Sequence, residues 1–160
     1  MNLTPLGIVH TAISLVALLA GLVELVRTGE IDPRTSLGKV YLVTTLLTCL
    51  TALGIFRHGG FGPPHALAVL TIACLAVGGM AAYTRNFGRA STPARLVAMS
   101  STFLFSLIPA ITETATRLPA GAPLVASADA PILGRIFGVL FLLSVIGVAF
   151  QLRRARAARS

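Results

Sequence analysis

Hydrophobic residues along this chain fall into five long runs, separated by four short connections that are richer in polar residues. The runs cover residues 5–26, 37–56, 64–84, 94–116 and 132–152. Each run has about the 20 apolar residues with which a helix crosses the ~30 Å hydrocarbon core of a bilayer. Backbone groups in lipid must be hydrogen-bonded within their own segment, and no run shows the two-residue alternation of barrel strands. The pattern therefore predicts an all-α integral membrane bundle of five transmembrane helices.

Composition agrees with this prediction. The 160 residues are 55% hydrophobic and only 11% charged, whereas a soluble domain is usually about a quarter charged. The first run follows a start without positive charge and is long for a signal sequence, so we interpret it as a retained helix. We expect one domain over residues 1–152 and a basic tail at 153–160.

Basic residues are distributed unevenly between the connections. Ten of the 13 flank the first and third connections or lie in the tail: Arg27, Arg34, Lys39, Arg85, Arg89, Arg95, Arg153, Arg154, Arg156 and Arg159. The positive-inside rule then places these segments in the cytoplasm and the N-terminus outside. The net charge of +8 is a topology signal rather than a sign of nucleic-acid binding, because no basic face of a folded domain carries it. We expect a multi-pass protein of a bacterial inner membrane, with the lipid bilayer as its partner.

Small and hydroxylic residues recur at helical spacing and mark the sides of the helices that face the bundle interior. The first run carries such a stripe through His10 and Ser14, and the second through Thr48 and Thr51. Such stripes are also ordinary packing in membrane helices, where hydroxyl groups bond to their own backbone.

Gly134 and Gly138 form a GxxxG pair in the last run, which lets two helix backbones approach closely. The pair could serve a homo-oligomer or a partner subunit, or an intramolecular contact, which we favour. Cys49 and Cys74 lie in the middle of runs two and three. There we interpret them as small packing residues.

Ionisable side chains within a membrane span cost free energy unless they are paired. Ordinary helix packing therefore does not explain the ionisable residues within the runs. In the predicted topology, His10, His58, His65 and Glu113 all lie on the outer side, whereas Glu24 lies near the inner end. A metal ion held by His10, His65 and Glu113 is one interpretation, because imidazole and carboxylate suit zinc or copper. A haem between two histidines is another. In the plainest interpretation, His10 bonds a threonine or a carbonyl, and Glu113 pairs with Arg117 or Arg135.

Some of these residues also carry a resemblance. His10 and Gly21, followed by the segment 36–42 with the sequence Ser-Leu-Gly-Lys-Val-Tyr-Leu, resemble an uncharacterised family of bacterial multi-pass membrane proteins. That family has a histidine early in its first helix and His-Arg-x-x-Gly-x-x-Tyr at the start of the second. The likeness covers about residues 6–118 and implies the fold rather than a function. Thr35 and Ser36 stand where the family has His-Arg, so a cofactor held by that histidine is not implied here.

The leading functional hypothesis is a polar pocket open toward the outer face, which binds or conducts a small molecule, an ion or a proton. Its lining is expected from His10, Ser14, Thr48, Thr51 and Glu113, with Glu113 facing His10 and stabilising its charged form. The sequence contains no nucleophile elbow or phosphate-binding loop, which disfavours an enzyme. The alternatives are an accessory membrane subunit without ligand chemistry and a metal- or haem-binding redox protein.

Overall fold

The computed structural model describes residues 4–55, 60–119 and 121–158, and these residues form five α-helices and no strand. The helices are α1 (Pro5–Thr28), α2 (Ser36–Leu53), α3 (Pro63–Tyr83), α4 (Ser91–Arg117) and α5 (Pro131–Ala157), with a 3₁₀ turn, η1 (Gly88–Ala90), before α4. Each α-helix is long and apolar enough to cross a membrane. The prediction of an all-α bundle with five such helices is confirmed.

Local signals explain where the helices begin and end. The hydroxyl group of Thr4 accepts a hydrogen bond from Gly7 N at the start of α1, and that of Thr35 accepts one from Gly38 N at the start of α2. Gly29 ends α1 with a φ of 80°, a left-handed conformation that favours glycine. Proline occupies the first turn of α1, α3 and α5, where its missing N–H costs nothing.

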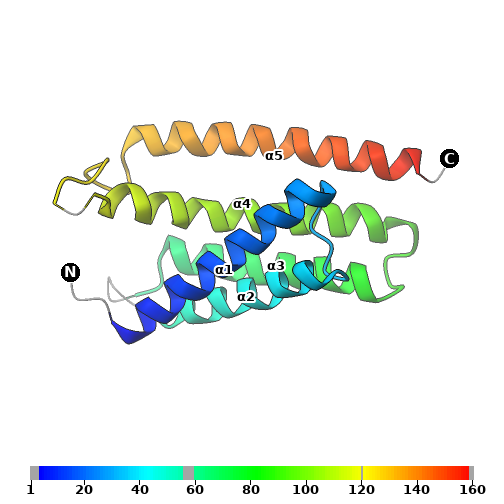
Figure 1. Ribbon diagram of the computed structural model, residues 1–160, viewed down its shortest axis with the longest axis horizontal. Coiled ribbons are helices and arrows are strands. Elements are labelled where there is room, and N and C mark those ends of the chain that lie inside the picture. The colour runs from blue at the N-terminus through cyan, green and yellow to red at the C-terminus, as the bar shows by residue number, and fades with distance from the viewer. Residues whose placement is uncertain (1–3, 56–59, 120, 159–160) are drawn as a thin grey trace.

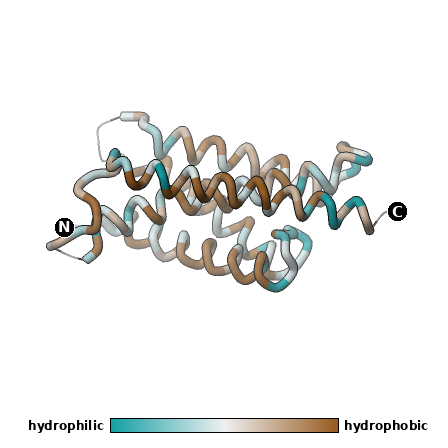
Figure 2. Tube along the Cα trace, turned by 90° about the horizontal axis from the view of Figure 1, so that it is seen from above, coloured by the Kyte–Doolittle hydropathy of each residue, from teal (hydrophilic) through white to brown (hydrophobic). Residues whose placement is uncertain are grey.

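The helices run lengthwise, with α1 against α2, α3 against α4, and α5 along the outer side of α4 (Figure 1). The start of α1 and the end of α5 lie at opposite ends of the molecule (Figure 1). Figure 2 shows hydrophobic residues along the middle of the helices and hydrophilic ones gathered toward the ends. α5 continues to Ala157, so most of the segment that we expected as a separate tail is helical.

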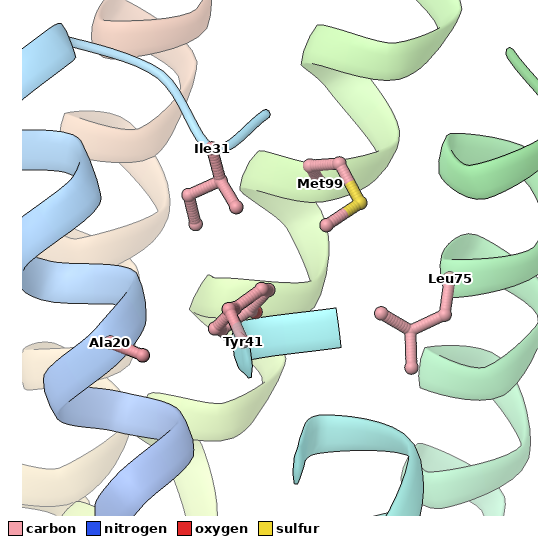
Figure 3. Packing of buried hydrophobic residues seen from close by; sticks show 5 residues of the cluster. All are labelled: Ala20, Ile31, Tyr41, Leu75 and Met99. Carbon is pink, nitrogen blue, oxygen red and sulfur yellow. The ribbon is translucent and has the colours of Figure 1, made fainter. Parts of the chain in front are cut away.

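The hydrophobic core lies between α1, α2, α3 and α4. Ala20, Tyr41, Leu75 and Met99 come from these four helices, and Ile31 comes from the connection between α1 and α2 (Figure 3). Ile31 is only 1% exposed. The first connection therefore inserts Ile31 into the core at one end of the bundle.

The contact that we favoured for the GxxxG pair is absent from the described part of the chain. A Cβ atom added at Gly134 or Gly138 would meet nothing within 4 Å. Leu133 is the one buried residue of α5, and Gly134 and Gly138 are both exposed. The two glycines therefore face outward, which corrects the intramolecular interpretation.

Candidate functional site

The first candidate site lies in the half of the α1–α2 contact that is nearer the start of α1. His10 Nδ1 lies 2.9 Å from Thr51 Oγ1, and both residues are half-buried. Thr51 Oγ1 also lies 2.9 Å from Leu47 O and 3.0 Å from Thr48 O. Carbonyl oxygens only accept, so the arrangement that satisfies most groups has the hydroxyl donating to a carbonyl and Nδ1–H donating to Thr51. Nδ1 then carries a proton in this contact.

Ser14 and Thr48 lie one helical turn from this pair, on α1 and α2 respectively. Ser14 Oγ donates to Thr11 O at 2.8 Å, and Thr48 Oγ1 donates to Thr44 O at 2.8 Å. Their hydroxyl protons are thus used by their own helices, as is common for serine and threonine in membrane helices. Their oxygen lone pairs make the contact between α1 and α2 polar next to His10. We call this contact the α1–α2 seam.

Glu113 does not join this group. It forms an ion pair with Arg117 one turn away on α4, and its side chain is 55% exposed. No hydrogen bond or ion pair joins His10 and Glu113, both of which lie within the described residues. An oppositely charged residue four positions away lies on the same helix face, and this local partner competes with any partner on another helix.

His65 has a structural role at the start of α3. Its Nδ1 accepts a hydrogen bond from Gly62 N at 3.2 Å, and its ring lies 5.3 Å from that of Phe61. Across residues 4–55, 60–119 and 121–158, no three His, Cys, Asp or Glu side chains are grouped so that they could hold a metal ion. His58 lies outside the described residues, and Cys49 and Cys74 are free thiols.

A second polar group, which the sequence analysis missed, lies at the opposite end of the bundle. Arg95 of α4 is 5% exposed, and its guanidinium lies 3.2 Å from a carboxylate oxygen of Glu30 and 3.3 Å from one of Asp32. Arg34 lies 2.6 Å from Asp32 as well. Two acidic residues of the α1–α2 connection thus surround a buried arginine, which sequence analysis had taken for a topology marker.

The pKa of Asp32 reflects these contacts. Burial alone would raise the pKa, but hydrogen bonds from the side chain and backbone of Arg34, with the charges of Arg95 and Arg34, outweigh it. The net result is a pKa below the ordinary value of 3.8. Asp32 is therefore ionised at neutral pH and serves as an anchor for two arginines.

Other helices hold the α1–α2 connection in place. Gln151 of α5 donates to Gly29 O at 2.9 Å and accepts from Ser100 Oγ at 3.0 Å. Tyr83 of α3 donates to Pro33 O. Side chains of α3, α4 and α5 all bond to this connection or to its partners. The connection is therefore held in one position.

The centre of the bundle also contains hydroxyl groups. Tyr41 Oη lies 2.8 Å from Thr102 Oγ1, which itself donates to Met99 O at 2.7 Å. Thr102 has a single proton, so Tyr41 is the donor in the pair. Thr45 Oγ1, one turn along α2, is buried and forms no hydrogen bond with the described residues. The interior is thus polar at the level of Tyr41 as well as at His10.

Taken together, the fold defines a class of protein: a helical bundle in which every α-helix of the described chain is long and apolar enough to cross a membrane. Comparison of the chain with protein-family models, with curated proteins and with solved structures found no match.

Proposed function

We propose that this chain is a multi-pass protein of a bacterial inner membrane, with the start of α1 outside and the end of α5 in the cytoplasm. The distribution of arginine supports this orientation. In intact cells, a membrane-impermeant maleimide should label Thr4→Cys but not Ala158→Cys, in a chain with Cys49→Ala and Cys74→Ala. Labelling of residue 158 instead would reverse the orientation.

Within that membrane, the proposed function is to bind or conduct a proton or a small polar ligand at the outer end of the α1–α2 seam. The hydrogen bond between His10 Nδ1 and Thr51 Oγ1 is the observation that supports it. Imidazole in general titrates near neutral pH, so a histidine ring hydrogen-bonded within a polar contact between two helices is a group that can carry a proton or hold a small polar ligand. Ser14 and Thr48 continue the polar side of the seam by one turn. Glu113 has no part in the proposal, because it pairs with Arg117.

The test uses purified full-length protein in liposomes under an imposed pH gradient. We expect His10→Ala to abolish any proton flux above that of protein-free liposomes, and Thr51→Val to shift its pH dependence. Thr44→Val is the matched control, because the Thr44 hydroxyl donates to Val40 O on its own helix.

A parallel NMR titration follows the imidazole of His10, and it also detects binding of a small ligand through a shift of the ring signals. A ring signal that does not titrate between pH 5 and 8, together with unchanged flux in His10→Ala, would refute the proposal. Glu113→Gln should behave like wild type in both measurements.

A second function, that of an accessory subunit, is favoured by one specific observation. Gly134 and Gly138 leave open space along the exposed side of α5, where another helix could approach closely. Pull-down of the tagged chain from native membranes should then recover a stoichiometric partner protein, and Gly138→Leu should lose that partner. The control is Leu143→Ala, a change at an exposed position on another side of α5, which should keep it. Recovery of the chain alone, or only as copies of itself, would remove the support for this function.

A further inference from the structure

Two grooves meet at Pro93, one on each side of α4. The first lies between α3 and α4, has a volume of about 520 Å³ and is lined by residues that include Cys74, Val77, Val97 and Ser101. Apart from Ser101, the side chains that line it are apolar, and several are alanines, whose small size leaves the groove open. A groove of this kind facing lipid accepts hydrocarbon rather than a polar ligand.

The second groove lies between the start of α4 and the end of α5 and has a volume of about 220 Å³. Arg89 and Arg156 line it, together with Pro93, Leu152 and Ala155. Two arginines that line one groove beside apolar residues suit a phosphate group, which arginine binds through paired hydrogen bonds. Figure 1 shows α4 lying between α3 and α5, so the two grooves flank the same helix.

The dimensions of the two grooves fit one ligand. From Pro93 to Ser101 the α4 backbone rises about 12 Å, and half of a ~30 Å hydrocarbon core is about 15 Å. The apolar groove therefore spans most of one leaflet, starting from the end that carries the arginines. Since Pro93 lines both grooves, the anionic part and the apolar part of a ligand can occupy them at the same time.

We propose that this surface binds an anionic phospholipid, with its phosphate between Arg89 and Arg156 and one acyl chain along the α3–α4 groove. The site rests on the part of the proposed function that places the chain in a membrane, and it does not depend on the chemistry of His10. Failure of the His10 test would leave it intact. Release of the protein from membranes by alkaline carbonate would refute both.

Native mass spectrometry of the full-length protein in detergent tests the site. The probes are phosphatidylglycerol and phosphatidylcholine with identical acyl chains, and glycerol 3-phosphate as the anionic group without chains. We expect phosphatidylglycerol to bind more tightly than phosphatidylcholine, and glycerol 3-phosphate not to displace it. The double variant Arg89→Gln/Arg156→Gln should lose roughly thirtyfold in affinity for phosphatidylglycerol, equivalent to about 2 kcal/mol, because it removes two basic residues near an anionic lipid surface.

The matched control is Arg85→Gln/Arg153→Gln, which removes the same charge from exposed positions outside the groove. Equal losses in both double variants would overturn the site, since the binding would then follow net charge alone. Displacement by glycerol 3-phosphate would overturn it as well, because a free phosphate compound would be the ligand.

Ala94→Leu tests the acyl-chain groove separately, by filling it. Ala12→Leu, at an exposed position of α1, is the control. We expect weaker phosphatidylglycerol binding in Ala94→Leu alone, with the helical circular dichroism of both variants unchanged. Wild-type binding in Ala94→Leu would refute the acyl-chain part of the site. If that variant fails to fold, the arginine variants still decide the proposal.

Discussion

Arg95 Nη1 lies 3.3 Å from Asp32 Oδ2, so that a buried cation on α4 meets an anion on the connection between α1 and α2. The same guanidinium lies 3.2 Å from Glu30. Burying a charge in a low-dielectric region is costly unless partners surround it, and here two carboxylates do so. This group joins the first two helices to the fourth and closes one end of the bundle.

Removal of Arg95 should therefore destabilise the protein strongly. We expect Arg95→Gln to lower the free energy of unfolding in detergent micelles by about 3 kcal/mol, because two carboxylates lose their buried counter-charge. The control is Arg34→Gln, whose side chain is 55% exposed and should contribute less than about 1 kcal/mol. Circular dichroism during denaturation measures both. Similar losses in the two variants would mean that burial of the Arg95 ion pairs does not increase their contribution to the free energy of unfolding.

The lowered pKa of Asp32 gives a pH dependence. A carboxyl group whose pKa is lower in the folded state stabilises the protein above its unfolded pKa of about 3.8, and this contribution disappears as the pH falls through the lower folded value. We expect the unfolding temperature to fall below pH 4 more steeply in wild type than in Asp32→Asn. Parallel curves for the two proteins between pH 7 and pH 3 would contradict this role for Asp32.

The Tyr41–Thr102 hydrogen bond should stabilise the centre of the bundle by a smaller amount. Interhelical hydrogen bonds in membrane proteins contribute about 0.6 kcal/mol on average, and rarely much more. A double-mutant cycle with Tyr41→Phe and Thr102→Val should give a coupling of that size. The control cycle pairs Tyr41→Phe with Thr71→Val, because Thr71 donates to Leu67 O on its own helix and should show no coupling.

The helices could be predicted from sequence because the hydrocarbon thickness sets their length and requires internal backbone hydrogen bonds. The sequence could predict the type of group that His10 bonds but not the particular residue, since the stripe on α1 faces several threonines in the stripe on α2. The role of Arg95 could not, because a basic residue at a helix end carries the same sequence signal whether it marks topology or pairs with a distant acid. The sequence did contain one indication of this ion pairing, because Glu30 and Asp32 are two carboxylates in a connection flanked by basic residues.

Gly21 and Gly38 each lie at a close contact in this structure. A Cβ atom on Gly21 would lie 2.8 Å from the Tyr41 ring. One on Gly38 would lie 1.8 Å from the backbone oxygen of Asp32. Close packing against the Tyr41 ring therefore accounts for Gly21, and close packing of the connection against α2 accounts for Gly38.

This packing makes the last prediction a contrast between two glycines. Gly38→Ala should cost roughly 3 kcal/mol of folding free energy, because the methyl group overlaps a backbone oxygen that other contacts hold in place. Gly134→Ala has open space and should be neutral, or stabilise by about 0.5–1 kcal/mol through its better helix propensity. Denaturant titration of monomeric protein in detergent measures both. A stable Gly38→Ala protein would mean that the connection shifts to make room for the methyl group, whereas a destabilised Gly134→Ala protein would mean that this side of α5 packs against the rest of the chain.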